Sequence, residues 1–328
     1  METIKNLIKP NEFEVFRRRK AKFLGKKMDY VQPGNTTIQL CNELLNMLND
    51  RTIDIRLMKR SGITCTKLTD DVLFCYGSKK APVTFFWRMG EMKVPGDEST
   101  YDNPVDPLIL EAPHEGKDNT ANTAMKLFEK TNAKVILFNL IHPKTRKIGG
   151  TWVSDPAHCM DTLYHKMHVK LTEMFPDAFV VQLHGWANTK NLMMCMNCYS
   201  NVFNRKPESG RPGPVLFGEA AMEVYNKKRR RKVFLGDRKF VKDGFRRPGG
   251  FHNTTVQARH LNGGNEYDRG EEDRGKFLHI EMGQPLIKRS GFWNYRRNVK
   301  KLAKVLNLTM EKWVKTPVNK DSVLPEVI

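Results

Sequence analysis

The sequence has few cysteines and no long hydrophobic run. Its six cysteines are scattered over 328 residues without the dense spacing of a disulfide framework, which suits thiols in a reducing compartment. No stretch approaches the ~18 uninterrupted apolar residues of a membrane-spanning helix. Residues 1–20 are polar and basic, without the apolar core of a secretory signal. We therefore expect a soluble, intracellular protein, cytoplasmic or nuclear, with no membrane span.

Acidic residues are scarce relative to basic ones. The chain has 36 Asp and Glu against 56 Lys and Arg, a net charge of +20. Such a surplus indicates a polyanionic partner, which is nucleic acid, an anionic membrane surface or an acidic substrate, and charge alone does not choose among them. The glycine motifs of nucleotide phosphate loops are also lacking.

The length of the chain exceeds that of one small domain, and a hydrophobic content of 39% is enough for a folded core. Residues 1–104 read as a basic N-terminal region with an amphipathic helix at 36–48. Short strand-like runs separated by turn residues follow this helix and predict a small antiparallel meander. These runs are residues 53–57, 71–76 and 83–87. Residues 105–328 read as a separate α/β domain.

Apolar runs alternate with amphipathic helices in this second region. The expected strands are residues 105–112, 134–140, 178–183 and 276–281, with a weaker candidate at 214–217. The expected helices are residues 119–130, 156–175 and 292–306. This alternation is typical of right-handed βαβ crossovers. The sequence therefore predicts the α/β class, with a mostly parallel sheet flanked by helices.

Two histidines stand at the ends of predicted strands, His114 after the first and His184 after the third. Because ligands of an open parallel sheet bind at the carboxyl ends of its strands, we place both in one candidate site. Glu115 and Asp118 stand beside His114, and two histidines with a carboxylate form the three-ligand set of a catalytic zinc. Glu281, on the last predicted strand, is the candidate general base.

Other potential metal ligands are given simpler interpretations. His165 and His168 lie three residues apart in the predicted helix 156–175 and are interpreted as surface or flank residues. Cys195 and Cys198 form a lone CxxC pair. Without a second pair at zinc-ribbon spacing, they are interpreted as incidental thiols.

Four short motifs occur in a set order along the chain. They are Pro113-His114-Glu115-Gly116 with Asp118 and Thr120, Gln182-Leu183-His184-Gly185, Asn253 with Gln257-Ala258-Arg259, and Leu278-His279-Ile280-Glu281 with Leu286. This order resembles the N-formylglutamate amidohydrolase and poly-γ-glutamate hydrolase group of zinc-dependent amidases, which have the carboxypeptidase-like metallohydrolase fold. The resemblance covers about residues 108–306.

The resemblance implies roles for individual residues. His114 and His184 become zinc ligands, Glu281 becomes the base that activates water, and the third ligand is either Asp118 or Glu115. Substrate-binding positions would be Arg146, Asn253 and Arg259, since a guanidinium pairs bidentately with a carboxylate. The implied activity is hydrolysis of an amide bond in an acidic substrate, a glutamyl or N-acyl amino acid or peptide, which an electropositive cleft would attract.

An alternative from another functional class is a basic nucleic-acid-binding or packaging protein, such as one of viral type, on the same hydrolase-like fold. It is favoured by the charge surplus and by an aromatic and basic segment at 292–297. Its candidate contacts are six consecutive basic residues, Lys227, Lys228, Arg229, Arg230, Arg231 and Lys232. A solvent-exposed helix end is the structural alternative for these six residues.

Overall fold

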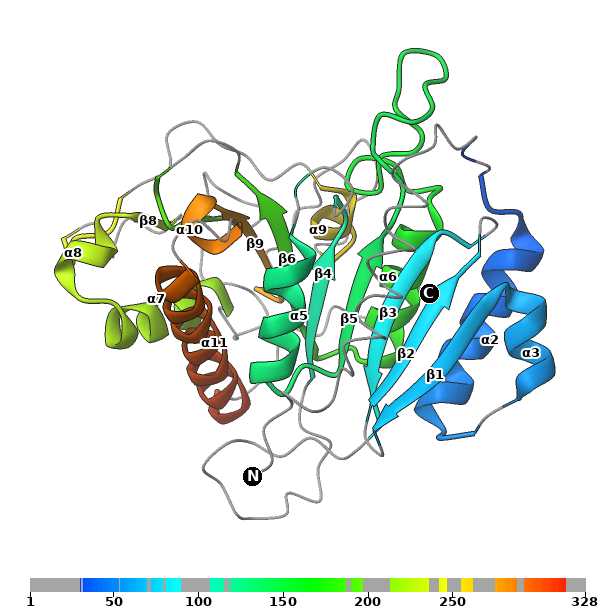
Figure 1. The fold of residues 1–328 in the computed structure, drawn as a ribbon, viewed down its shortest axis with the longest axis horizontal. Coiled ribbons are helices and arrows are strands. Elements are labelled where there is room, and N and C mark those ends of the chain that lie inside the picture. The colour runs from blue at the N-terminus through cyan, green and yellow to red at the C-terminus, as the bar shows by residue number, and fades with distance from the viewer. Residues whose placement is uncertain are drawn as a thin grey trace, which may run out of the picture.

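A nine-stranded sheet organises the computed structural model, with helices on both of its faces (Figure 1). The strand order is β1-β2-β3-β5-β4-β6-β9-β7-β8. The structure describes residue 30 and residues 32–52, 54–69, 72–78, 81–89, 107–114, 118, 120–186, 190–196, 213–235, 242–246, 255–261, 275–287 and 292–316. Within these residues, no helix is long and apolar enough to cross a membrane.

The described residues of the N-terminal region form two helices and three antiparallel strands. Its elements are α2 (Asn35–Asn49), α3 (Ile55–Ser61), β1 (Ile63–Thr69), β2 (Val72–Gly77) and β3 (Val83–Arg88). The predicted helix at 36–48 and the antiparallel meander are both present, but the predicted strand at 53–57 is wrong. The carboxylate of Asp54 accepts hydrogen bonds from the backbone N–H groups of Arg56 and Leu57 and so starts a helix there. Gly62, at φ 74°, ends that helix in the left-handed region that glycine adopts readily.

The central strands are parallel and carry the candidate site. They are β4 (Leu108–Ala112), β5 (Val135–Asn139), β6 (Phe179–Gly185) and β9 (Phe277–Met282). In the order β5-β4-β6-β9 each of them pairs in parallel with its neighbour. The four predicted apolar strands are therefore all present, and the predicted α/β class is confirmed.

The sheet as a whole is mixed, so the prediction of a mostly parallel sheet is wrong. The meander does not stand apart from the central strands, because β3 pairs antiparallel with β5. At the other edge, β7 (Met193–Met196) pairs antiparallel with β9, and β8 (Val233–Leu235) pairs in parallel with β7. The sheet thus continues across the predicted boundary between residues 104 and 105, and the division into two domains stays a prediction.

One predicted strand is part of a helix, and one predicted helix is shorter than expected. The predicted strand at 214–217 is wrong, since it lies in α7 (Gly213–Val224), where Pro214 occupies the first turn that tolerates proline. The helix predicted at 156–175 is shorter, α6 (Leu163–Met174). The hydroxyl of Thr162 accepts a hydrogen bond from the backbone N–H of His165 and caps its first turn.

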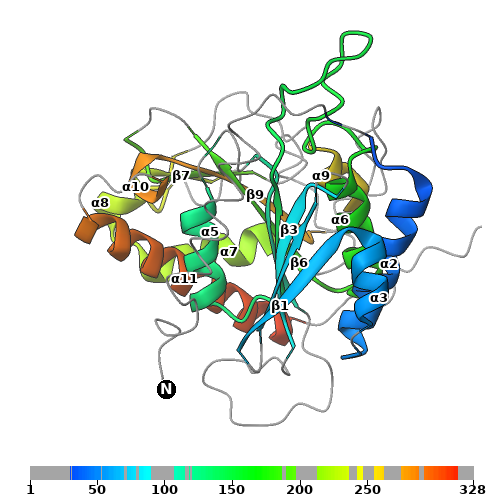
Figure 2. The ribbon, with the colours of Figure 1, turned by 45° about the vertical axis from the view of Figure 1, so that its right-hand side comes forward.

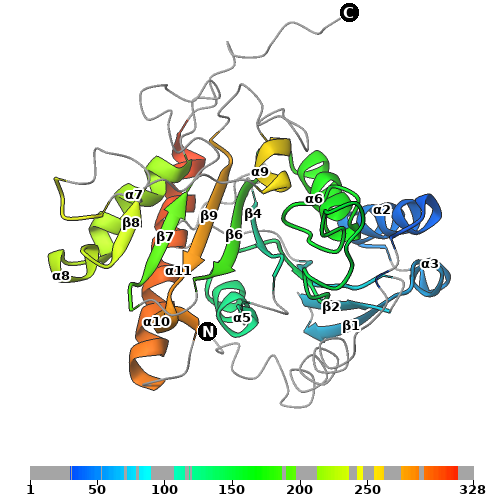
Figure 3. The ribbon, with the colours of Figure 1, turned by 90° about the horizontal axis from the view of Figure 1, so that it is seen from above.

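Helices cover the sheet on both faces and bury a separate apolar cluster on each (Figures 2 and 3). The helices α2, α3, α6 and α9 (Val256–Leu261) pack on one face. The helices α5 (Ala121–Lys130), α7, α10 (Gln284–Ile287) and α11 (Phe292–Lys315) pack on the other. Because side chains alternate along a strand, even and odd positions of β6 face different layers. Val181 and Leu183 belong to the α7–α11 layer, while Val180 belongs to the α6–α9 layer.

Candidate metal centre

The candidate site lies where β4, β6 and β9 end. His114 follows β4 by two residues, and His184 is the next-to-last residue of β6. Glu281 of β9 stands directly opposite His184 in the parallel register. The sheet therefore brings together side chains that are up to 167 positions apart, since 281 − 114 = 167.

Three potential ligand atoms converge on one point. The carboxylate oxygen Oδ2 of Asp118 lies 3.7 Å from Nδ1 of His114 and 3.6 Å from Nδ1 of His184. The two imidazole rings meet edge to face, with centroids 4.8 Å apart. His114, Asp118 and His184 form one of two groups of described residues whose ligand atoms all lie within 4.8 Å of one another. Glu115, the alternative third ligand, lies outside the described residues.

The second ring nitrogen of His114 is held by a carboxylate. Nε2 of His114 lies 2.7 Å from Oδ1 of Asp155. Burial alone would raise the pKa of Asp155, but this hydrogen bond and the positive charges of His114 and His158 lower that pKa below its usual value. An ionised Asp155 only accepts hydrogen bonds, so His114 donates from Nε2 and, when neutral, leaves the Nδ1 lone pair facing Asp118.

His184 is oriented by a chain of amide hydrogen bonds that starts at a backbone carbonyl. The Pro156 carbonyl accepts a hydrogen bond from Nε2 of Gln257 at 2.6 Å, which leaves Oε1 of Gln257 to accept one from Nε2 of Gln182 at 3.2 Å. Nε2 of Gln182 also donates to the carboxylate of Glu111 at 3.2 Å. Oε1 of Gln182 is thereby left as the acceptor for Nε2 of His184 at 2.9 Å.

The orientation of Gln182 fixes the tautomer of His184. Because a carboxylate and a carbonyl can only accept, neither amide in the chain can be reversed without losing hydrogen bonds. His184 must then donate from Nε2 and keep its Nδ1 lone pair toward Asp118. Burial lowers the pKa of His184 well below its usual value, and the positive charges of His279 and His114 lower it further. Both histidines thus present Nδ1 to the same carboxylate, and His184 does so as a neutral imidazole.

A second group of potential ligands adjoins the first and shares His184 with it. The ring of His279 stacks on that of His184, with centroids 4.2 Å apart and planes 7° apart. Nε2 of His279 lies 3.1 Å from Oε1 of Glu281. Burial would raise the pKa of Glu281, but the hydrogen bond to His279 and the positive charge of His279 lower it. Glu281 is therefore ionised at neutral pH, the state that a proton acceptor requires.

Sequence reasoning missed His279 and Asp155 as site residues. His279 precedes Glu281 by two positions on β9, so the period-2 alternation of strands places both on one face and could have identified it. Asp155 lies in the long connection between β5 and α6. No local pattern marks that position as a partner of His114.

At Gly185 the backbone of β6 passes close to Asp118, one of the two candidates for the third ligand. Its N–H donates to Oδ2 of Asp118 at 3.1 Å. A Cβ atom at residue 185 would lie 2.7 Å from the carbonyl oxygen and 2.8 Å from Cβ of Asp118. Only glycine allows this approach without a shift of Asp118.

We expect Gly185→Ala to displace Asp118 and to lower the free energy of unfolding by ~1–3 kcal/mol. Urea unfolding monitored by circular dichroism measures this effect. Gly34→Ala is the matched control, because no atom lies within 4 Å of a Cβ built there, and its effect should stay within ~0.5 kcal/mol. Equal effects of the two substitutions would show that residue 185 has room for a side chain.

His165 and His168 are fully buried, so their interpretation as surface or flank residues is wrong. Nδ1 of His168 lies 2.6 Å from Oε1 of Glu111, which is also fully buried. The ring of His165 lies 5.7 Å from that of His168 and 6.0 Å from that of His260. Both histidines face the sheet because α6 turns this side toward β4. Through Glu111 and Gln182, their cluster joins the hydrogen-bond chain that orients His184.

His165 makes stability depend on pH. Burial, followed by the positive charges of His168, His260 and Lys166, lowers the pKa of His165 to about 2. An unfolded histidine has a pKa of about 6.5, so above that pH His165 is neutral in both states and does not change the free energy of unfolding. Below pH 6.5 only the unfolded state binds a proton at this residue, which lowers the free energy of unfolding by about 1.4 kcal/mol per pH unit. Between pH 6.5 and pH 5 the wild-type protein should lose about 2 kcal/mol through this residue.

We expect His165→Gln to lose less stability than the wild type over this interval, by up to about 2 kcal/mol. Urea unfolding of both proteins at pH 6.5 and pH 5 measures the difference, independently of any stability offset between them. His142→Gln, at an exposed position, serves as the control and should behave as the wild type. Identical acid sensitivity of His165→Gln and the wild type would contradict the account.

The structure describes two of the three predicted substrate-binding residues. Arg146 is exposed, and its guanidinium donates to the carbonyl of Tyr30 at 2.8 Å. Arg259 lies half-buried in α9, and Asn253 lies outside the described residues. A substrate contact for any of these three residues stays a prediction.

The six basic residues at 227–232 divide into different environments. Lys227–Arg230 form the short helix α8, and a turn follows. The guanidinium of Arg230 donates to three backbone carbonyls, those of Met222, Tyr225 and Asp243. Arg230 is therefore a structural residue, whereas Lys228, Arg229 and Lys232 line a pocket. Binding of nucleic acid by this segment stays a prediction.

Cys195, the first cysteine of the CxxC pair, is buried in β7. Burial raises the pKa of its thiol far above the usual value, which makes it a poor nucleophile and a poor metal ligand at neutral pH. Cys198 lies outside the described residues, so a joint role of the pair is untested.

The chain was compared with known proteins. No family model and no curated protein matches it. Among solved structures it is similar to N-formylglutamate amidohydrolase from Ralstonia eutropha JMP134, at 13% identity and a TM-score of 0.38, over 71% of this chain and 99% of that one. A metallo-carboxypeptidase from Pseudomonas aeruginosa matches at 11% identity and a TM-score of 0.38, over 70% of this chain.

That match spans 61% of the Pseudomonas enzyme, less than two thirds of its length. A metallo-carboxypeptidase from Burkholderia cenocepacia matches at 10% identity and a TM-score of 0.34, over 87% of this chain and 70% of that one. These proteins belong to the enzyme classes that the sequence motifs resemble. With TM-scores below 0.5 the likenesses carry no weight for activity, and function has to be inferred from the side chains of the site itself.

Proposed function

We propose that this chain is a zinc-dependent hydrolase that cleaves an amide bond in an acidic substrate, a glutamyl or N-acyl amino acid or peptide. The observation that carries the proposal is the convergence of Nδ1 of His114, Nδ1 of His184 and Oδ2 of Asp118, with Glu281 beside them. Two imidazoles and one carboxylate are the protein ligands of many catalytic zinc sites.

The distances from Asp118 to the two histidine nitrogens are compatible with a zinc ion. Ligands at the usual zinc distances of about 2.0–2.2 Å in tetrahedral geometry lie about 3.4 Å from one another. The distances of 3.6 and 3.7 Å from Asp118 to the two histidines come close to this value. Each histidine also has its other ring nitrogen held by an acceptor, the arrangement that orients metal-bound imidazoles. Asp118 is accordingly our choice for the third ligand.

Zinc, when bound, would supply Lewis-acid activation of a water molecule and of the scissile carbonyl. Glu281 supplies the proton acceptor. Its carboxylate belongs to the group with His184 and His279 whose potential ligand atoms lie within 4.8 Å of one another, so it is close enough to accept a proton from a water molecule in the site. His279 donates to Glu281 and holds it in place. The protonated Glu281 can then pass the proton to the leaving amine.

The acidic character of the substrate is supported by the charge of the chain and by the motif resemblance. A net charge of +20 attracts anionic molecules over long range at low ionic strength. Arg146 and Arg259, which the motif resemblance assigns to the substrate carboxylate, would supply the positive charge close to the site.

Hydrolysis of a defined substrate panel tests the proposal. The zinc-loaded protein should release formate from N-formylglutamate or glutamate from poly-γ-glutamate, and it should act more slowly on N-formylglutamine, which lacks the side-chain carboxylate. A chelator should abolish the activity and added zinc should restore it. Failure of the zinc-loaded protein on every acidic amide, or activity that resists chelation, would contradict the proposal.

A further inference from the structure

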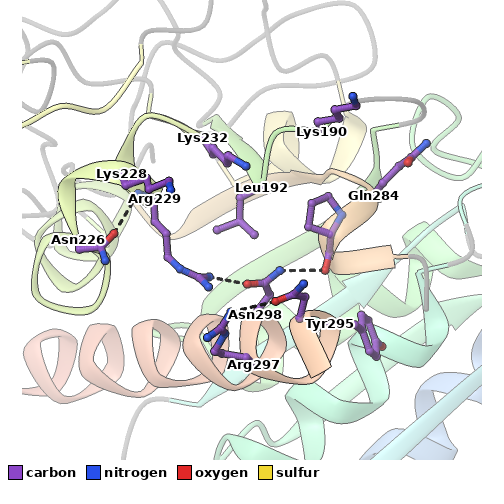
Figure 4. Close-up of a pocket in the computed structure, with 12 residues that line it drawn as sticks. Lys190, Leu192, Asn226, Lys228, Arg229, Lys232, Gln284, Tyr295, Arg297 and Asn298 are labelled. Carbon is purple, nitrogen blue, oxygen red and sulfur yellow. Dashed lines mark hydrogen bonds between the residues drawn. The ribbon is translucent and has the colours of Figure 1, made fainter. Parts of the chain in front are cut away.

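A second concave site lies on the other side of the sheet from the candidate metal ligands. It is a cavity of about 580 Å³ between the segment before β7, the α8 region, the start of α10 and the first turns of α11 (Figure 4). This volume is within the range of small-molecule sites. Leu192, at its floor, belongs to the apolar cluster of the α7–α11 layer, whereas Ile109 and Val180, on the strand face that carries His184, belong to the other layer.

Positive charge dominates the lining of this pocket. Among the described residues that line it, five of twelve are cations and none is acidic. Figure 4 shows three lysines on one side of the cavity and an arginine of α11 on the other. The five are Lys190, Lys228, Arg229, Lys232 and Arg297. Within the part of the chain that the structure describes, none of them forms an ion pair, while Lys312 of the same helix α11 pairs with Glu223 at 3.0 Å.

The arginine at the centre of the pocket is held in place by neutral groups. Nη1 of Arg229 donates to Oδ1 of Asn298 at 2.5 Å, and Nδ2 of Asn298 donates to the carbonyl of Pro285 at 3.3 Å. The side chain of Asn226 caps the backbone N–H of Arg229 at 3.1 Å. These contacts fix the guanidinium without neutralising it, and they leave its other N–H groups available to a ligand.

The positive charges of the pocket help to lower the pKa of a neighbouring lysine, Lys301. The pKa of Lys301 is lowered by burial and then by the charges of Arg229, Arg297 and Lys304. Cations that repel one another without a carboxylate between them destabilise the folded chain, and an anion that binds among them would relieve the repulsion. The clustered cations of the pocket therefore favour binding of a ligand that carries several negative charges.

We propose that this pocket binds a compact oligophosphate, such as inorganic polyphosphate or the phosphate chain of a nucleotide. The five cations surround a cavity of only about 580 Å³, so a ligand with a high density of negative charge matches them best. A glutamyl chain has one carboxylate per residue and is less densely charged than an oligophosphate. Lysine and arginine together suit phosphate oxygens, the former as a point charge and the latter as a fork. The proposal does not depend on hydrolytic activity or on zinc.

The only aromatic ring found among the described lining residues is buried, which favours recognition of phosphate groups over bases by this pocket. Tyr295 is the one aromatic residue among the described residues of the lining, and it is 2% exposed. Its ring is covered by the ammonium of Lys126 at 4.4 Å. Since bases bind single-strand sites by stacking on exposed aromatic rings, the described part of the lining offers no ring on which a base could stack.

Calorimetric titration of the full chain with inorganic tripolyphosphate tests the proposal. The variant replaces the three exposed lysines of the pocket, Lys190→Gln, Lys228→Gln and Lys232→Gln. The matched control removes the same charge at exposed positions elsewhere, Lys59→Gln, Lys144→Gln and Lys315→Gln. We expect tripolyphosphate to bind the pocket variant roughly 30- to 100-fold more weakly than the wild type, and the control variant within about twofold of it.

Since tripolyphosphate also chelates metals, only the difference between pocket and control variants counts as support. Equal affinity of both variants would overturn the proposal and make the binding an effect of net charge. ATP that binds as tightly as tripolyphosphate would identify a nucleotide as a source of the phosphates, and much weaker ATP would favour inorganic polyphosphate. Much tighter binding of a 20-nucleotide DNA strand or of a γ-glutamyl hexamer than of tripolyphosphate would also overturn the proposal, in favour of an extended polyanion.

Discussion

His184→Ala is expected to leave the purified protein with less than about a tenth of its zinc and with no measurable amidase activity. His184 is the ligand whose orientation is most completely specified, through the hydrogen-bond chain from Pro156, Gln257 and Gln182. Without it, His114 and Asp118 remain, and two ligands do not hold a catalytic metal. Metal content by mass spectrometry and activity on the acidic panel measure the two effects.

His142→Ala is the control for this prediction, because it removes an exposed histidine outside the cluster. It should retain both zinc and activity. Retention of one equivalent of zinc by His184→Ala would place the metal elsewhere, and the first positions to examine would then be Cys195 and Cys198.

Glu281→Gln is expected to keep its zinc and to lose rate by roughly 10²- to 10⁴-fold. The amide keeps the size of the side chain and can still pair with His279, but it cannot accept a proton. The effect should fall on kcat and leave the Michaelis constant almost unchanged, because the carboxylate acts in the transition state. Steady-state kinetics on the best substrate of the panel measures the split.

Glu173→Gln makes the same chemical change at an exposed position on α6 and should leave both constants unaltered. Unchanged turnover of Glu281→Gln would show that Glu281 is only a strand residue. Loss of zinc from Glu281→Gln would show instead that Glu281 ligates the metal, together with His184 and His279.

The apolar strands were predictable because their signal is local. Four runs of buried apolar residues became β4, β5, β6 and β9 within a few positions, and the rule that ligands gather at strand ends brought His114 and His184 together. Two carboxylates beside His114 in the sequence, Glu115 and Asp118, were candidates for the third ligand, and the sequence did not choose between them. The mixed character of the sheet was not predictable, because the pairing of β3 with β5 depends on the path of the chain and not on any single run.

The buried polar network could not be derived from the sequence. His165, His168 and Glu111 are titratable groups that usually stay on the surface, and only the packing of α6 on the sheet buries them together. Their hydrogen-bond partners come from β4, β6 and α9, and no spacing rule predicts such partners. Gln182 appeared in a motif, yet its role in setting the tautomer of His184 depends on Gln257, 75 positions away.

Anomalous X-ray diffraction at the zinc absorption edge, on crystals of the protein purified without added chelator, is the most direct test of the proposed metal centre. The account predicts one strong peak about 2.0–2.2 Å from each of three atoms. Those atoms are Nδ1 of His114, Nδ1 of His184 and Oδ2 of Asp118. A zinc-supplemented crystal with no peak there, or with its peak between His279 and Glu281 instead, would contradict the account.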